Sequence, residues 1–213
     1  MSNEPKQKAG VRATQKEATR QAVLEAARAE FERVGFEAAN LRAIAASAGV
    51  SAGTVLHHYG DKRELLHAAL FDDLDETLRS TVAGLGAGTL EAQLSELTRG
   101  VFRYYQQRPK LSRALLKESL FADEPWAQKF SGQVRDVHGV IARLAEEAGA
   151  RGELRPGVDG ALFAVAYFSF FYFALISWVQ SAHGAPVALV ERLVHQHLEG
   201  LRPIEKPSRR RSP

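Results

Sequence analysis

The sequence predicts an all-α protein of about nine helices. Apolar residues recur at helical spacing along most of the chain, and glycines, prolines and capping side chains divide these stretches. No segment alternates polar and apolar residues as a half-buried strand does. Of the 213 residues, 45% are hydrophobic and 25% are charged, which is ordinary for a globular protein. A chain of this length can bury a sizeable core in one large or two small domains.

The first helices are expected to be short and closely spaced. The first dozen residues are polar, and we expect them to be disordered. Each later boundary is predicted from a capping side chain or a glycine. In chain order, we expect helices over 19–34, 41–48 and 52–58 and a long one from 62, capped by Asn40, Ser51 and Asp61 and stopped by Gly35, Gly49 and Gly60.

The rest of the chain predicts five further helices. A glycine-rich stretch over 84–88 separates them from the first four, and Pro109, Pro125 and Pro186 mark further starts and breaks. The expected helices cover about 89–107, 110–121, 125–149, 158–182 and 186–201.

Positive charge gathers at both ends of the chain. Residues 1–24 carry five basic residues against two acidic ones, and residues 202–213 carry five against one, although the whole chain is only +3. The part between them is therefore net negative. Basic ends on an acidic body suit a local polyanion such as a DNA backbone. Basic tails also improve solubility, and this alternative stays open for the C-terminal one.

The segment 41–59 is the most informative part of the sequence. Two short helices flank Gly49, a residue that can adopt the positive φ of a tight turn. Small and apolar residues fall where these two helices would face each other and the first helix: Ile44, Ala45, Ala48, Val50 and Val55. This is the spacing of a helix-turn-helix, whose second helix enters the major groove of DNA. Such helical hairpins also occur in proteins that do not bind DNA, so spacing alone leaves both possibilities open.

A set of residues at fixed spacing over 15–66 favours the DNA-binding interpretation. It comprises Thr19-Arg20-Gln21-Ala22-Val23-Leu24-Glu25-Ala26-Ala27, Phe31, Gly35-Phe36, Ile44-Ala45, Gly49-Val50-Ser51, Gly53-Thr54, Tyr59, Lys62 and Leu65-Leu66. This pattern resembles the DNA-binding domain of the TetR/AcrR family of transcriptional regulators. Beyond residue 70 only the helix layout is similar. The resemblance implies a helix-turn-helix domain over 15–64 and a ligand-binding and dimerisation domain over 65–202, between disordered basic segments at 1–14 and 203–213.

The resemblance also implies roles for single residues. Thr19, at the start of the first helix, and Lys62, at the positive end of the fourth, would bind phosphate. Asn40 and Arg42 would contact phosphates or base edges. The groove-facing residues of the recognition helix would be Ser51, Ala52, Thr54, Leu56 and His57.

The recognition helix departs from the family pattern at three positions. Many relatives have a lysine at the position of Ala52, a tyrosine at that of Leu56 and an aromatic residue at that of His58. We therefore expect anchoring to the DNA backbone to depend on Arg42, His57, Lys62 and the basic N-terminal arm. Ordinary surface or packing roles stay open for both histidines.

Residues 161–179 contain no charged side chain and would form a helix about 28 Å long. This length is near the lower limit for a membrane span. Two serines, several alanines and the lack of a second such segment argue against insertion. A helix that is apolar on every side is also typical of a protein core or interface. The resemblance implies a homodimer formed through the last two helices, which explains the composition, so we expect no membrane association. The N-terminus lacks the apolar stretch of a signal peptide, and we expect a cytoplasmic location.

We expect no catalytic site, metal site or cofactor. The chain has no cysteine, which excludes disulfides and thiolate chemistry. His195 and His197 are two residues apart, so they would point to different sides of a helix and make a poor metal site. Neither a glycine-rich phosphate loop nor a serine elbow occurs.

The resemblance implies a small-molecule effector held by the helices that follow residue 65. Aromatic rings with a few polar tips suit a largely apolar ligand, although each ring can also simply fill the core. The candidates are Phe102, Tyr105, Leu116, Phe121, Trp126, His138, Phe168, Phe171 and Tyr172. The sequence thus predicts a ligand-responsive regulator, in this family most often a repressor. It would bind a pseudo-palindromic operator as a homodimer and be released by a small, largely apolar ligand.

Overall fold

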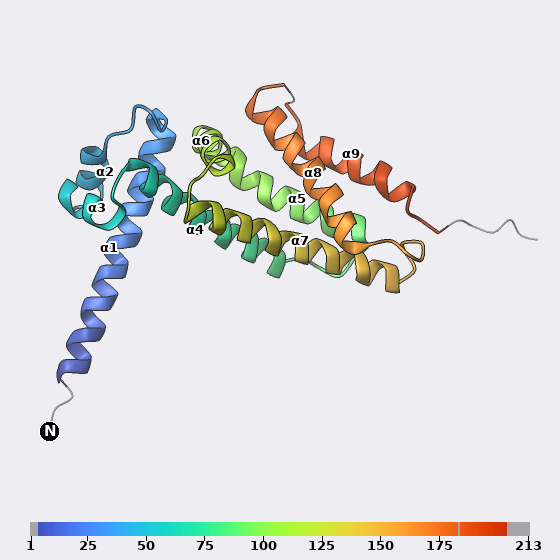
Figure 1. Cartoon of the computed structure of the whole chain (residues 1–213), viewed down its shortest axis with the longest axis horizontal. Helices are drawn as coiled ribbons and strands as arrows, with labels where there is room; N and C mark the ends of the chain where they lie inside the picture. The colour runs from blue at the N-terminus through green and yellow to red at the C-terminus, as the bar shows by residue number, and fades with distance from the viewer. Residues whose placement is uncertain (1–3, 183, 204–213) are drawn as a thin grey trace, which may run out of the picture. The chain divides into compact units, whose positions relative to one another are not determined.

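Nine α-helices make up the regular secondary structure of the described chain (Figure 1). A computed structural model describes residues 4–182 and 184–203, with side chains from Thr14 onward. The helices are α1 (Glu4–Val34), α2 (Leu41–Ser47), α3 (Ala52–Tyr59), α4 (Lys62–Ala83), α5 (Leu90–Gln107), α6 (Pro109–Leu120), α7 (Trp126–Ala150), α8 (Gly160–Val179) and α9 (Pro186–Glu199). The predicted all-α class is confirmed. Of the expected basic tail over 203–213, only Pro203 lies within the described residues.

The start of α1 is the largest difference from the predicted boundaries. The helix begins at Glu4 and not near Thr19, so the expectation of disorder over 1–14 is wrong for residues 4–14. The prediction depended on apolar spacing, which begins only at Val23. Residues before it are mainly lysine, glutamine, alanine and arginine, which favour a helix without any apolar face.

The predicted caps hold the other early helices. Asn40 accepts a hydrogen bond from the Arg42 N–H at 2.8 Å and caps α2. The Ser51 hydroxyl accepts from the Thr54 N–H at 3.0 Å and caps α3. Gly49 has a φ of 69°, a conformation in which a Cβ would be strained. The glycine between α2 and α3 is therefore required by the turn.

The chain divides into two compact units. The first unit holds the chain up to Glu76 together with Tyr105–Phe130, and the second holds Thr77–Tyr104 and the chain from Ser131. Helices α4, α5 and α7 each have residues in both. The first unit buries Val23, Leu24, Phe31, Ile44, Val55, Leu65 and Leu66, and the second buries Leu94, Phe102, Ile141, Phe163, Tyr167 and Val190. The predicted functional division near residue 64 stays a prediction.

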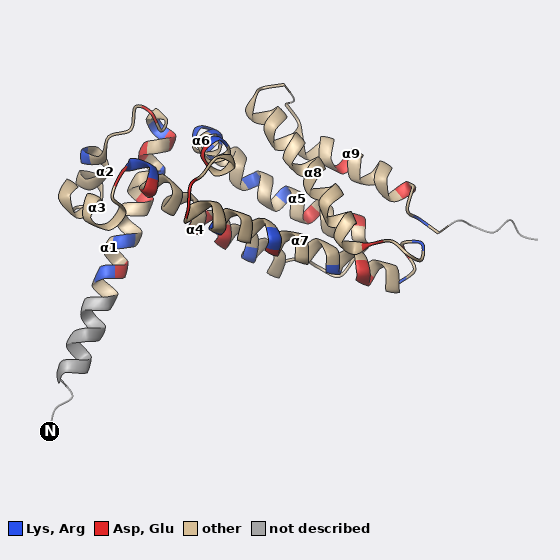
Figure 2. Cartoon of the chain, in the orientation of Figure 1, with Lys and Arg blue, Asp and Glu red and all other residues tan. Residues whose placement is uncertain are grey.

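Helix α8 is apolar both on the face it buries and on the face it exposes. It contains none of the charged residues coloured in Figure 2, and by length and composition it could cross a membrane. Asp159 caps it by accepting from the N–H groups of Ala161 and Leu162 at 2.8 and 3.1 Å. Within the second unit it packs against α9. Its buried face holds Phe163, Tyr167 and Phe171, whereas Leu162, Val165 and Phe173 are exposed.

Candidate DNA-binding site

Helices α2 and α3 form a tight hairpin on α1. The turn between them is closed by backbone hydrogen bonds from Gly49 to Ala46 at 3.2 Å and from Val50 to Ala45 at 2.9 Å. Ile44, Ala45 and Val55 are at most 2% exposed, as predicted, and anchor the hairpin in the core of the first unit. Ala48 and Val50 are only half-buried. The hairpin is thus fixed at its apolar side and presents the opposite side of α3 to solvent.

The solvent side of α3 carries a leucine, two histidines and two hydroxyl side chains. Leu56 is 45% exposed, and both His57 and His58 are exposed, with their rings edge to face at 5.6 Å. The hydroxyls of Ser51 and Thr54 are 2.9 Å apart and hydrogen-bonded. Figure 2 shows α3 without lysine, arginine, aspartate or glutamate. Such a surface offers hydrogen bonds and apolar contacts, which suit base edges in the major groove more than phosphates.

Within the hairpin, the arginine lies on α2 and not on α3. Arg42 is exposed at the start of α2, and within the described residues no carboxylate pairs with it. Asn40 is exposed next to it, although its side-chain oxygen is already used as the cap of α2. Ala52, which occupies the position of a lysine in many relatives, is half-buried, and no lysine or arginine elsewhere on α3 replaces that lysine. The predicted phosphate contact of Arg42 therefore stays a prediction that its exposure allows.

Lys62 has a structural partner that the sequence did not indicate. It is the first residue of α4, and its ammonium donates to the backbone carbonyls of Glu37 at 2.9 Å and Ala39 at 3.2 Å. The same ammonium lies 4.8 Å from the ring centre of Phe36. Lys62 thus fastens the loop between α1 and α2. An ammonium has three donors, so a phosphate contact stays a prediction, but replacing Lys62 would also loosen this loop.

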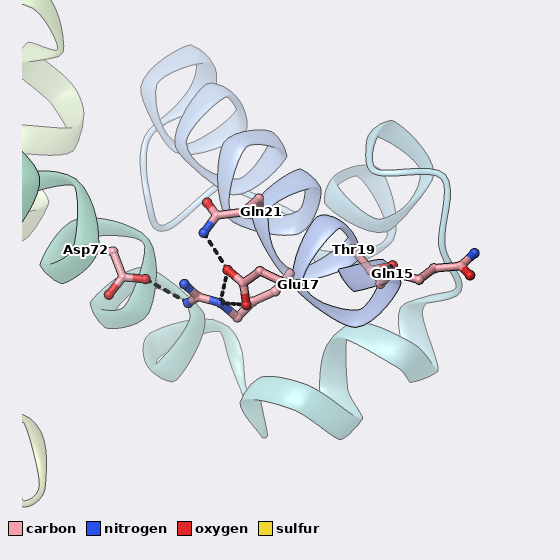
Figure 3. Close-up of polar contacts among 6 residues, drawn as sticks. Gln15, Glu17, Thr19, Gln21 and Asp72 are labelled. Carbon is pink, nitrogen blue, oxygen red and sulfur yellow. Dashed lines mark hydrogen bonds and ion pairs between the residues drawn. The ribbon is translucent and has the colours of Figure 1, made fainter. Parts of the chain in front are cut away.

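The predicted position of Thr19 is wrong. Thr19 lies in the middle of α1, where its hydroxyl donates to the Gln15 carbonyl at 2.9 Å (Figure 3). The predicted phosphate site needed the free N–H groups of a helix N-terminus. Because α1 begins at Glu4, no such end exists at Thr19.

The predicted ligand-binding residues are divided between the two units. In the first unit, Tyr105, Leu116 and Trp126 are buried. In the second unit, the ring centres of Phe102 and Phe171 are 4.6 Å apart, while Phe168 contacts His138 at 4.9 Å and stacks on Tyr172 at 5.5 Å. The two ring groups of the second unit stay candidates for ligand contact.

Phe121 does not belong with them. It is 85% exposed, because α6 ends at Leu120 and Phe121 is the residue that caps the helix. This exposure contradicts the prediction that Phe121 lines a ligand pocket.

His67 was not predicted. It is 2% exposed on α4, and neither ring nitrogen has a hydrogen-bond partner within the described residues. Its ring lies 5.4 Å from Trp126 and 5.7 Å from Phe130. Burial lowers the pKa of His67 and favours the neutral ring. Its place inside the apolar run 65–70 was a signal that could have identified it.

A short capped helix that follows a glycine turn and is supported by two other helices is the arrangement of a helix-turn-helix. Residues 23–69 match the family model described as "Bacterial regulatory proteins, tetR family". The chain is 31% identical to the transcriptional repressor AcnR of Corynebacterium efficiens over 142 residues, which cover 66% of this chain and 71% of AcnR. It is 33% identical to the repressor KstR of Mycobacterium tuberculosis over 138 residues, or 63% of this chain and 60% of KstR.

The chain therefore belongs to the TetR family of bacterial transcriptional regulators. Its fold agrees with this assignment. The FadR regulator of Bacillus subtilis superposes with a TM-score of 0.71 at 17% identity, covering 85% of this chain and 99% of that one.

Proposed function

We propose that this regulator binds a pseudo-palindromic operator as a homodimer and represses transcription until a largely apolar ligand releases it. The observation that carries the proposal is the exposed side of α3, where Thr54, Leu56 and His57 are held by a buried hairpin and a Ser51 cap. Repression is supported by the relatives AcnR and KstR, which are named repressors. Operator binding is assigned to residues 15–64, and ligand binding and dimerisation to 65–202.

The exposed face of α8 supports a homodimer through α8 and α9. Leu162, Val165 and Phe173 are 66%, 48% and 56% exposed. An apolar helix face of this kind needs a cover in a protein that remains in water. A second copy provides that cover without membrane insertion, which agrees with a cytoplasmic regulator. In the dimer, the two recognition helices would enter successive major grooves about 34–36 Å apart.

The aromatic groups of the second unit support an apolar ligand. The ring pair of Phe102 and Phe171 and the group of His138, Phe168 and Tyr172 provide apolar surface. The Nε2 atom of His138 is buried and has no hydrogen-bond partner within the described residues, so it can bind a polar group of the ligand. The B. subtilis FadR structure contains stearoyl-CoA, a molecule with a long apolar chain. Coupling of about 1–3 kcal/mol between ligand and operator would suffice for a switch. We propose no enzymatic activity.

Selection of bound fragments from the source genome tests this function. The purified protein should enrich a small set of inverted repeats, and binding to them should weaken steeply with salt, because phosphate contacts release counterions. The neighbouring genes would then indicate which ligands to try. Enrichment of no sequence above random DNA would contradict operator binding.

A further inference from the structure

Two neighbouring carboxylates of α4 each bind an arginine of α1. The Arg20 Nη1 and Asp72 Oδ2 atoms are 2.7 Å apart, and the Arg28 Nε and Asp73 Oδ2 atoms are 3.7 Å apart. Arg28 also donates to the Ala69 carbonyl at 2.9 Å. Consecutive helical residues point about 100° apart, so Asp72 and Asp73 leave α4 in different directions. The arginines are eight residues apart on α1, or about 12 Å. Two separate contacts therefore fix how α4 crosses α1.

The two contacts differ in strength. Asp73 binds a second arginine, Arg108, which directly precedes α6, and the side chains of Arg28 and Asp73 are only 14% and 24% exposed. The side chains of Arg20 and Asp72 are each 38% exposed. Water and salt screen an exposed pair more strongly. The Arg20–Asp72 pair is thus the contact that opens more easily, while Asp73 keeps α4 attached.

Arg20 is held in place by Glu17 of its own helix. The Arg20 Nε lies 3.2 Å from both carboxylate oxygens of Glu17. Gln21 donates to Glu17 at 2.8 Å (Figure 3). The hydrogen bond to Asp72 raises the pKa of Arg20. Glu17 therefore orients the guanidinium so that Nη1 faces α4.

The end of the recognition helix lies beside this group. Tyr59 is the last residue of α3, and its hydroxyl is buried. Burial raises the pKa of Tyr59, while the positive charge of Arg20 acts in the opposite direction. Residues of α1, α3 and α4 thus meet around the Arg20 guanidinium.

We propose that Arg20 and Asp72 are positioning residues for DNA binding. Their ion pair fixes the angle between α1 and α4, with Asp73 as the pivot, and so sets the direction in which α3 is presented. Helix α4 continues from the first unit into the second, so a change of this angle turns the α1–α3 segment relative to the rest of α4. The inference deepens the proposed operator binding, but its main test does not require an operator.

A distance measurement between two spin labels tests the proposal. The chain has no cysteine, so Ala38→Cys in the α1–α2 loop and Glu147→Cys on α7, both at exposed positions, give a unique label pair. Labelled chains are mixed with an excess of unlabelled ones, so that only distances within one chain are read. Asp72→Asn and Arg20→Gln should each widen the distance distribution about twofold, as expected when a hinge is released.

Arg33→Gln is the matched control, because its ion pair with Glu30 lies within α1 and does not involve α4. Unchanged widths in folded Asp72→Asn and Arg20→Gln, or equal widening in Arg33→Gln, would overturn the proposal. Asp72→Asn keeps the shape of the side chain, and circular dichroism measures whether the variant has the helix content of the wild type.

On a selected operator whose half-sites are moved apart by one base pair, Asp72→Asn should lose less affinity than the wild type. A failure of all variants to bind DNA would contradict operator binding and leave the distance result intact.

Discussion

Helices α3 and α8 both lack lysine, arginine, aspartate and glutamate, yet the same lack of charge has different consequences (Figure 2). In α3, eight residues expose two histidines and one leucine beside polar caps. In α8, twenty residues bury one aromatic face and expose another apolar one. In the proposed function, the missing charge would mark a surface for contacts with base edges in the first case and an apolar dimer interface in the second. Length and the exposed side chains distinguish the two helices, because α3 has eight residues and exposes histidines, whereas α8 has twenty and exposes Leu162, Val165 and Phe173.

The largest expected effect comes from a charge on the buried face of α8. Phe171 is 9% exposed and packs against Phe102. Phe171→Glu loses about 3–5 kcal/mol of packing. It also leaves an unpaired buried charge, which costs about another 3–5 kcal/mol. The sum is comparable with the whole stability of a small domain, so the variant should not fold. Thermal unfolding followed by circular dichroism measures this, and a cooperative transition near the wild-type temperature would contradict the burial of Phe171.

The matched substitution on the exposed face should separate folding from assembly. Phe173→Glu places a charge two residues further along α8, where the side chain is 56% exposed within one chain. We expect normal helix content but dimerisation weakened by about 3–5 kcal/mol, because the charge would be buried in the dimer. Sedimentation should show a monomer for this variant and a dimer for the wild type. A dimeric Phe173→Glu protein would place the interface elsewhere.

On α3, the expected effect is smaller and concerns sequence preference. His57→Ala should weaken binding to the best operator by about 1–3 kcal/mol if the ring contacts a base edge. The loss should be concentrated at one position of each half-site, measured by competition between operator variants. His58→Ala is the neighbouring control. An equal loss on all operator variants would make His57 a backbone contact, and no loss would remove it from the groove.

The smallest expected effect is a pH dependence of stability from His67. Burial lowers the pKa of His67 in the folded state, and the carboxylates of Glu118 and Glu64 only partly oppose this. The folded protein therefore disfavours the protonated His67 ring. The unfolding free energy is not reduced by this effect above the ordinary histidine pKa of about 6.5, and it decreases as pH falls below that value. The slope is at most about 1.4 kcal/mol per pH unit.

His67→Leu should flatten this dependence, measured as unfolding free energy between pH 8 and pH 5.5. His58→Gln, at an exposed position, should leave the dependence unchanged. A slope that survives in His67→Leu would assign the effect to other groups.

Local signals predicted most of the fold, because caps and glycines act within a few residues. Asn40 and Ser51 cap the helices they were expected to cap, and Gly49 has the positive φ that its turn requires. The start of α1 was missed because a helix without an apolar face leaves no periodic signal. The expected position of Thr19 at the start of the helix was wrong for the same reason.

The candidate site was less predictable, since its contacts join distant residues. Lys62 binds the carbonyls of Glu37 and Ala39, which lie 25 and 23 positions earlier in the chain. Backbone carbonyls have no residue type, so no sequence pattern could indicate them. The exposure of Phe121 could not be predicted for a different reason. An aromatic side chain at the end of a helix is buried or exposed according to the direction that the chain takes after the helix.

The absence of lysine and arginine from α3 has a consequence for how the regulator would search a genome. In the proposed function, the attraction to random DNA would come from cations such as Arg42 and would weaken as ionic strength rises. The preference for the operator over random DNA would depend on uncharged groups of α3, whose contacts release few counterions. Higher ionic strength would therefore shorten the time spent on wrong sequences while leaving discrimination between sequences almost unchanged.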